Sequence, residues 1–101
     1  MKKILLCCSA GMSTSLLVTK MKKAAEEKGI DVEINAVALE LFDENLLKYD
    51  VFLLGPQVKF KKNDFQKKAD EYNKKVEVIN MVDYGTMNGA KVLDFALNLI
   101  K

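Results

Sequence analysis

The sequence predicts an α/β fold built on a four-stranded parallel sheet. Strand-like runs occur at residues 3–7, 31–37, 50–54 and 76–81, and segments with helical spacing of apolar residues separate them. Strands that alternate with helices are typical of a parallel sheet with helices on both faces. Half of the 101 residues are apolar, which suffices for a core of its own. We therefore expect residues 1–101 to form a single three-layer domain.

The first half of the chain should contain two strands and two helices. Residues 3–7 are apolar from Ile4 onward, as in a strand that is buried on both faces. Residues 13–28 repeat apolar positions at helical spacing, and Gly29 suits the left-handed end of that helix. Residues 31–37 alternate between apolar and polar side chains, which predicts an edge strand. A short helix is expected over residues 39–48.

The third strand decides the predicted topology. Residues 50–54 are apolar from Val51 onward, so this strand should be central, and Gly55-Pro56 ends it. The first and third strands are the most apolar, and if they are neighbours the sheet has the order 2-1-3-4. Ligands of open parallel sheets bind beyond the carboxyl ends of the strands, where the winding reverses. This order places a crevice between residues 8–15 and Gly55-Pro56-Gln57.

The last part of the chain should complete the sheet and cover it. A third helix is expected over residues 60–73, with a capping box at residues 63–66. A fourth strand at residues 76–81 then leads into a loop at residues 83–87. Asn88 should cap the last helix.

The segment after the first strand is the candidate functional site. Cys8 stands where a strand gives way to a helix N-terminus, whose free N–H groups and partial positive charge attract anions and favour a thiolate. Cys8 is therefore predicted to be a nucleophile that handles phosphate, with a buried core cysteine as the alternative. Cys7 should point to the opposite face of the sheet and into the core.

The rest of this loop is rich in small and hydroxyl residues. Its hydroxyls and its closely approachable backbone suit an oxyanion, although Ser13 or Ser15 would equally serve as an ordinary helix cap. Both roles use the same N–H donors and are compatible. The predicted phosphate-binding residues are Ser9, Ala10, Gly11, Met12, Ser13, Thr14 and Ser15.

A second wall of the site is expected from two other segments. Gln57 would bring an amide to the crevice, although Gly55-Pro56 also suits a plain strand-ending turn. Tyr84 follows the fourth strand at the same edge of the sheet. We interpret Tyr84 first as a loop aromatic packed on the surface, and second as part of the site wall.

Two residue types are missing from the chain. All sixteen basic residues are lysines, and there is no histidine. Phosphatase and arsenate-reductase loops carry an arginine six positions after the cysteine, where this chain has Thr14 followed by Ser15. Without that guanidinium a hydrolytic transition state is poorly stabilised. The loop therefore favours a phosphoryl carrier over a hydrolase, and any histidine that takes part must come from another protein.

Net charge and hydropathy argue against a nucleic-acid-binding, secreted or membrane-spanning protein. The net charge is only +2, and lysines alternate with acids over residues 20–28, as on a solvated face and unlike a nucleic-acid surface. The N-terminal apolar run is too short for a signal peptide, and no run approaches the length of a membrane span. We expect a cytoplasmic protein with reduced thiols, no nucleic-acid partner, no membrane insertion, no cofactor and no metal.

Two motifs resemble a known family. Cys-Ser-Ala-Gly-Met-Ser-Thr-Ser-Leu-Leu-Val at residues 8–18 and Leu-Leu-Gly-Pro-Gln at residues 53–57 are similar to those of the IIB component of the bacterial phosphotransferase system (PTS), lactose/cellobiose/chitobiose type. The resemblance extends over the whole chain. It implies a fold similar to that of low-molecular-weight tyrosine phosphatases. Only residues 59–63 are more basic than this family leads us to expect.

The resemblance also implies a mechanism and partners. Cys8 would take a phosphoryl group from a phosphohistidine of the IIA protein and pass it to a β-linked disaccharide that enters through the IIC membrane permease. Backbone N–H groups of residues 10–15 would hold the phosphate. The protein would then work at the inner face of the membrane, peripheral to the permease. A phosphatase or arsenate-reductase-like enzyme and a thiol-based regulatory module are the alternatives.

Overall fold

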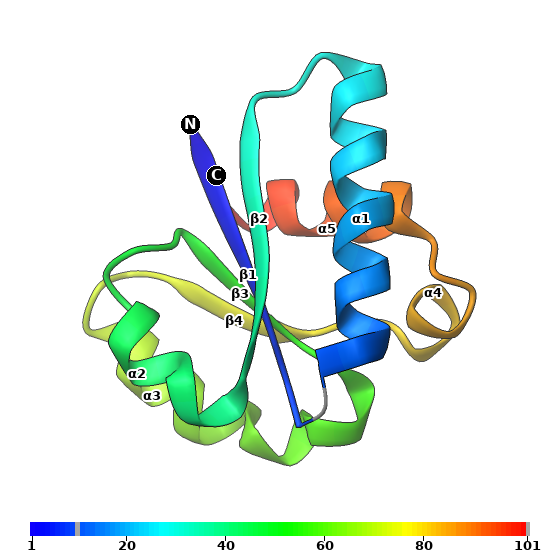
Figure 1. The fold of residues 1–101 in the computed structure, drawn as a ribbon. Coiled ribbons are helices and arrows are strands. Elements are labelled where there is room, and N and C mark those ends of the chain that lie inside the picture. Colours follow the sequence, from blue (N-terminus) through cyan, green and yellow to red (C-terminus); the bar gives the residue numbers. More distant parts are fainter. Residues whose placement is uncertain (10, 101) are drawn as a thin grey trace.

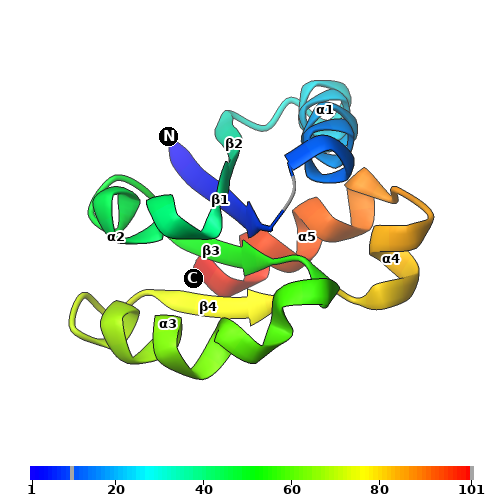
Figure 2. The ribbon, with the colours of Figure 1, turned by 60° about the horizontal axis from the view of Figure 1, so that its bottom comes forward.

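The computed structural model describes residues 1–9 and 11–100, apart from the side chains of residues 11–13. Its four strands form one parallel sheet in the order β2-β1-β3-β4, as the sequence predicted (Figures 1 and 2). The two apolar strands are thus the central neighbours, and the edge position of the second strand is confirmed. The strands are β1 (Lys2–Cys8), β2 (Val32–Ala38), β3 (Val51–Leu54) and β4 (Lys75–Val78).

Helices cover the sheet on both faces. The first and last helices pack against one face, and the two middle helices pack against the other. Two short 3-10 segments precede the middle helices. The helices are α1 (Gly11–Lys28), α2 (Phe42–Asn45), α3 (Lys62–Asp70), α4 (Met81–Gly85) and α5 (Gly89–Ile100), and the 3-10 segments are η1 (Leu39–Leu41) and η2 (Pro56–Lys61).

Strand β1 divides the core into two apolar clusters. Its side chains alternate, so that Ile4 and Leu6 face α1 and α5 while Leu5 and Cys7 face α2 and α3. All four side chains are fully buried. A strand that contributes to both clusters must be apolar at every position, which explains the uninterrupted run in the sequence.

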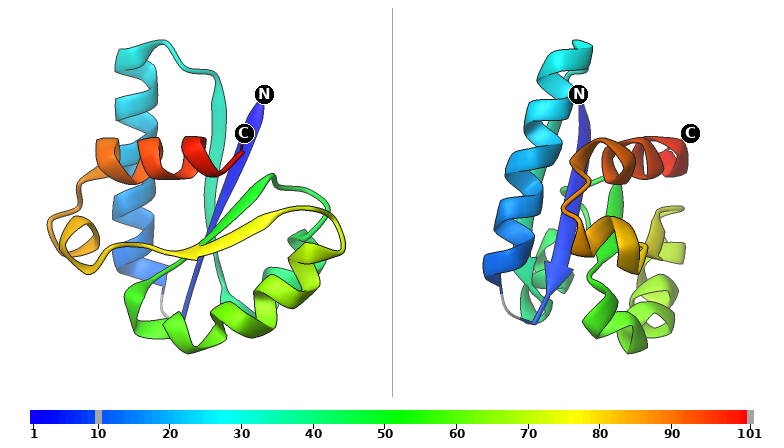
Figure 3. Two further views of the ribbon diagram at one scale, coloured as in Figure 1. Left: turned by 180° about the vertical axis from the view of Figure 1, so that it is seen from behind. Right: turned by 90° about the vertical axis from the view of Figure 1, so that its right-hand side faces the viewer.

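The close approach of α5 to α1 depends on a glycine. The two helices cross in the views of Figures 1 and 3, and Gly89 lies at the crossing. A Cβ added to Gly89 would lie 2.5 Å from the carbonyl carbon of Lys20. An ion pair of 2.9 Å between Lys28 and Asp94 adds a second link between the two helices.

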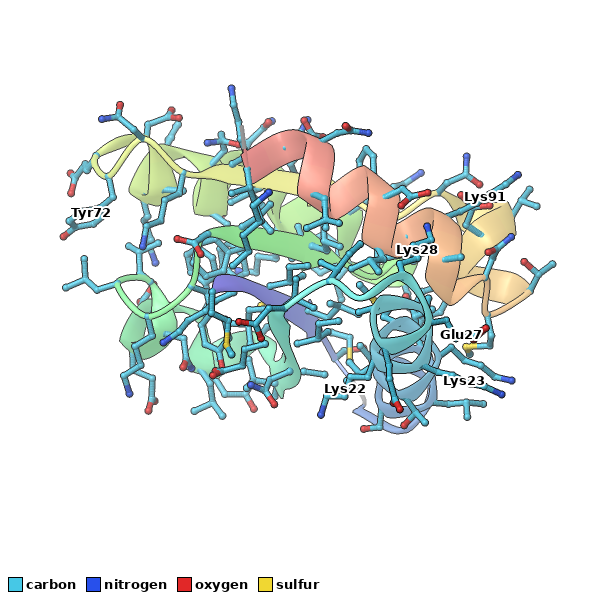
Figure 4. The ribbon with its side chains drawn as sticks, turned by 90° about the horizontal axis from the view of Figure 1, so that it is seen from above. Lys22, Lys23, Glu27, Lys28, Tyr72 and Lys91 are labelled. Atoms are coloured by element: carbon cyan, nitrogen blue, oxygen red, sulfur yellow. The ribbon has the colours of Figure 1, made fainter. Side chains whose placement is uncertain are left out.

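The outer side of α1 is polar, as the alternating charges predicted. Lys22, Lys23 and Glu27 are exposed, and Figure 4 shows their side chains pointing away from the molecule. On the inner side, Leu17 and Met21 are fully buried. The helix ends at Gly29, whose φ of 67° is the left-handed conformation that the sequence predicted.

The two middle helices differ from the prediction. The helix expected over residues 39–48 is divided into η1 and α2, and Leu47 is 70% exposed. The helix expected over residues 60–73 already begins as η2 at Pro56, and α3 ends at Asp70. Tyr72 follows the end of this helix and is 43% exposed.

The predicted capping box at residues 63–66 is wrong. Helix α3 begins after Lys61, which makes no side-chain cap. Gln66 is used elsewhere: its Oε1 accepts from the N–H of Val76 at 2.8 Å, and its Nε2 donates to the carbonyl oxygen of Lys74 at 3.0 Å. The side chain thus ties α3 to the start of β4, and this tertiary contact outweighs the local capping preference.

The loop predicted at residues 83–87 is also wrong, because most of it belongs to α4. Asn80 caps this helix, and its Oδ1 accepts from the N–H groups of Val82 at 2.8 Å and Asp83 at 3.2 Å. The predicted cap of α5 is confirmed, since the Oδ1 of Asn88 accepts from the N–H of Lys91 at 3.2 Å. Within the described part of the chain, no helix has the length and apolarity that a membrane crossing requires.

Candidate functional site

The site lies where β1 ends and α1 begins, at the carboxyl edge of the sheet (Figure 2). Cys8 is the last residue of β1 and is only 1% exposed. The first turn of α1 contains no acidic residue, so no side chain there neutralises the partial positive charge of the helix. Because β1 and β3 are neighbours, this edge is also the place where the winding of the sheet reverses.

Thr14 is the side chain that meets the Cys8 sulfur. Its Oγ1 donates a hydrogen bond of 2.8 Å to Sγ of Cys8. Thr14 is fully buried, on the same inner side of α1 as Leu17 and Met21. A hydroxyl placed in an apolar helix stripe must find a partner, and here the partner is the sulfur. The predicted loop residue Thr14 is thus brought into direct contact with Cys8.

Tyr84 reaches the same point from α4. Its hydroxyl lies 3.3 Å from Oγ1 of Thr14 and 3.3 Å from Nε2 of Gln57. Tyr84 is 9% exposed, so our preferred interpretation of it as a surface aromatic is wrong. The signal that we missed was Asn80, whose cap starts the helix that turns Tyr84 inward.

The segment after β3 lies beside the end of β1, as the predicted strand order requires. The N–H of Gly55 donates to the carbonyl oxygen of Cys7 at 3.1 Å, which holds this segment beside the end of β1. A Cβ added to Gly55 would lie 3.7 Å from Cβ of Cys8. Pro56 then opens η2, and Gln57 follows as an exposed residue whose amide contacts Tyr84.

The structure describes some of the other predicted loop residues fully, some only by their backbone and one not at all. Ser9 and Ser15 are exposed beside Cys8 and Thr14. The backbone of Gly11, Met12 and Ser13 forms the first residues of α1, and their side chains lie outside the described part. Ala10 also lies outside the described residues.

The two cysteines are chemically distinct. Both are reduced thiols, and their side chains leave opposite faces of β1, as predicted. Burial, and to a smaller extent the neighbouring charge of Cys8, together raise the pKa of Cys7 to about 12. Cys7 therefore stays protonated at neutral pH.

The arrangement can hold an anion and stabilise a sulfur anion, but it offers little else. Among residues 1–9 and 11–100, no cluster of His, Cys, Asp and Glu side chains could hold a metal ion. The groups that meet at the described site are a thiol, two hydroxyls, an amide and backbone N–H donors. Such a set suits transfer of a phosphoryl group to and from sulfur.

Comparison with known proteins decides the family. Residues 3–95 match the family model described as PTS system, Lactose/Cellobiose specific IIB subunit. The chain belongs to this family. It is accordingly a phosphoryl carrier of a sugar phosphotransferase system, as the two sequence motifs indicated.

Three relatives match over nearly their full length. The chain is 53% identical to the PTS system oligo-beta-mannoside-specific EIIB component of Bacillus subtilis, with 99% of this chain and 97% of the relative covered. It is 52% identical to the galactose-specific component of Lactococcus lactis subsp. cremoris and 51% identical to the cellobiose-specific component of Lactococcus lactis subsp. lactis, with 98% and 96% covered in both pairs.

Solved structures agree with the fold. The cellobiose-specific IIB component of Borrelia burgdorferi matches with a TM-score of 0.81 at 43% identity, covering 98% of this chain and 91% of that one. The lactose-specific IIB domain of Streptococcus pneumoniae has a TM-score of 0.86 at 20% identity and coverages of 99% and 98%. YwlE of Bacillus subtilis, with a low-molecular-weight tyrosine phosphatase fold, has a TM-score of 0.56 at 14% identity and coverages of 99% and 94%.

Proposed function

We propose that Cys8 accepts the phosphoryl group and carries it as a phosphocysteine. The observation that supports this is the 2.8 Å hydrogen bond from Oγ1 of Thr14 to Sγ of Cys8 at the N-terminus of α1. A hydroxyl donor and a helix N-terminus both stabilise a thiolate, which is the nucleophilic form of cysteine. The protonated Cys7 offers no competing nucleophile.

The donor is a phosphohistidine of a IIA protein. The Cys8 thiolate attacks the phosphorus atom in line, the S–P bond forms and the P–N bond breaks. The electron pair of that bond stays on the imidazole of the donor. Imidazole is a good leaving group, so the step needs no strong general acid, and this chain has no histidine to supply one.

The phosphoryl group would rest in the loop between the two transfers. We assign its binding to Ser9, Ala10, Gly11, Met12, Ser13, Thr14 and Ser15, mainly through the backbone N–H groups at the start of α1. Gly55, Pro56, Gln57 and Tyr84 form the facing wall.

The acceptor is a β-linked disaccharide, or a related sugar, bound by the IIC membrane permease. A sugar hydroxyl attacks the phosphorus atom, the O–P bond forms and the S–P bond breaks. The electron pair returns to sulfur, where Thr14 stabilises it, and the hydroxyl proton passes to this thiolate or to solvent. The named relatives are specific for oligo-beta-mannoside, galactose and cellobiose at 51–53% identity to this chain, so the choice of sugar belongs to the permease. The carrier then works on the cytoplasmic side, peripheral to the permease.

Mass spectrometry of the chain after incubation with the phosphorylated donor cascade tests this proposal. We expect one phosphate-sized gain in mass, located at Cys8 and labile as a thiophosphate. Cys8→Ser should show no labile gain, whereas Cys7→Ala should be labelled like the wild type. Steady turnover of an aryl phosphate without a labelled intermediate would point to a hydrolase instead, against the absence of arginine in the chain.

A further inference from the structure

Four side chains around the site form one chain of hydrogen bonds with a defined direction. The hydroxyl of Thr14 has a single hydrogen, and it is directed at Sγ of Cys8. The 3.3 Å contact between Thr14 and Tyr84 must then be donated by the tyrosine. The Tyr84 oxygen in turn accepts from Nε2 of Gln57 at 3.3 Å. All three donors therefore point toward the sulfur.

We propose that Gln57 is a positioning residue that acts on Cys8 through Tyr84 and Thr14. By donating to the Tyr84 oxygen, its amide leaves the phenolic hydrogen to point at Thr14. If Tyr84 were free to turn, Thr14 could donate to the tyrosine oxygen and release the sulfur. Hydrogen bonds in such a chain also polarise one another, so the outer donor strengthens the inner one. This role rests on the proposed function of Cys8 as phosphoryl carrier.

Gly55 supports the same conclusion independently. Its φ of −62° and ψ of 149° are accessible to any residue, so the backbone does not require glycine there. A Cβ at this position, however, would lie 2.6 Å from Oε1 of Gln57. The missing side chain thus leaves the room in which Gln57 folds back toward Tyr84.

Two substitutions at position 57 separate this role from a structural one. Gln57→Met keeps the length and removes the donor, and Gln57→Glu replaces the donor with a carboxylate that accepts the Tyr84 hydrogen. Since Gln57 is exposed, both variants should unfold at the wild-type temperature. In single-turnover transfer from the phosphorylated IIA donor at pH 7.5, we expect Gln57→Met to be about fivefold slower than wild type. Gln57→Glu should be slower still, because its carboxylate draws the Tyr84 hydrogen away from Thr14.

A double-mutant cycle tests whether Tyr84 transmits the effect. In a Tyr84→Phe background, Gln57→Met should change the transfer rate no further. The same fivefold loss in that background would overturn the proposal, because Gln57 would then act without the tyrosine. Gly55→Ala should slow transfer about as much as Gln57→Ala, and the double variant should be no slower than either.

The outcomes distinguish this inference from the proposed function. If the wild-type chain takes up no phosphoryl group on Cys8, the proposed function fails. If the wild type is phosphorylated and the Gln57 variants transfer at the wild-type rate, only the positioning role fails.

Discussion

Cys7 and Cys8 are neighbours in one strand, and the structure gives them opposite chemistry. Cys7 packs in the apolar cluster between the sheet and helices α2 and α3. Cys8 faces the other way and meets the hydroxyl of Thr14 at 2.8 Å. Both are buried, with 0% and 1% of their surfaces exposed, so exposure does not distinguish them. The difference arises because consecutive side chains leave a strand on opposite faces, and only one face leads to a helix N-terminus.

The comparison shows that two equally buried thiols have different surroundings, an apolar cluster around Cys7 and a hydroxyl donor beside Cys8. In an apolar cluster the thiolate loses its hydration without replacement, and the pKa of Cys7 rises to about 12. At the end of β1, Thr14 and the start of α1 can replace the lost water around Cys8. The following experiments test this difference between Cys7 and Cys8, in order of decreasing expected effect.

Substituting Cys7 and Cys8 one at a time should give the largest difference in the rate of sugar phosphorylation. Cys8→Ser should lower sugar phosphorylation in a reconstituted relay at least about a thousandfold, since it removes the nucleophile. Cys7→Ala should leave the rate within about twofold of wild type and lower the free energy of unfolding by about 1 kcal/mol through a small cavity. A relay that still runs with Cys8→Ser, measured as sugar phosphate formed, would refute the assignment.

Removing the Thr14 hydroxyl, which contacts Cys8, should have the next largest effect on phosphoryl transfer. Thr14→Val keeps the shape of a buried side chain but deletes the donor to the Cys8 sulfur. A hydrogen bond to a charged group contributes about 1.5–3 kcal/mol, so we expect single-turnover phosphoryl transfer to fall about ten- to hundredfold.

Thr19→Val is the matched control for this experiment. Thr19 lies in the same helix, and its hydroxyl donates to the backbone oxygen of Ser15 on the exposed side. We expect its transfer rate to stay within about twofold of wild type. Equal losses for Thr14→Val and Thr19→Val would show that the helix, and not the bond to sulfur, is responsible.

The sequence predicted the strand order and the position of Cys8 because both follow from local patterns. Strands β1 and β3 are central, and burial on both faces leaves an uninterrupted apolar run. The two sides of the crevice then followed from the topology of a parallel sheet. Gly55 does lie beside Cys8, as the predicted order requires.

The role of Tyr84 could not be predicted in the same way. Its contact with Thr14 joins residues 70 positions apart. That contact depends on α4, a helix of five residues that follows the cap by Asn80. Such a short helix has no periodic pattern to reveal it. Gln66 illustrates the same limit, because its contact with Val76 in β4 replaced the local cap that the sequence favoured.

Alkylation should distinguish the two thiols directly. With a pKa of about 12, roughly one part in ten thousand of Cys7 is thiolate at pH 8. Folded wild-type protein treated with iodoacetamide at pH 8 should therefore take up one label per chain, on Cys8, as seen by intact mass. Cys8→Ala should take up none over the same time and one after unfolding in urea. Labelling of Cys7 in the folded Cys8→Ala protein would show that burial does not protect it.

The smallest effect concerns stability at alkaline pH. The pKa of Cys7 lies near 9.0 in the unfolded chain and near 12 in the folded protein. Above pH 9 the unfolded state releases this proton while the folded state retains it, so stability that is fully present below pH 9 decreases as the pH rises toward 12. The Cys7→Ala variant has no thiol at this position and lacks this pH-dependent contribution to stability. The gap in unfolding free energy between wild type and Cys7→Ala, measured by urea titration from pH 8 to 10.5, should therefore close and then change sign as the pH increases. A constant gap would mean that Cys7 ionises as easily in the folded core as in the unfolded chain, and the contrast with Cys8 would then rest on the Thr14 hydroxyl alone.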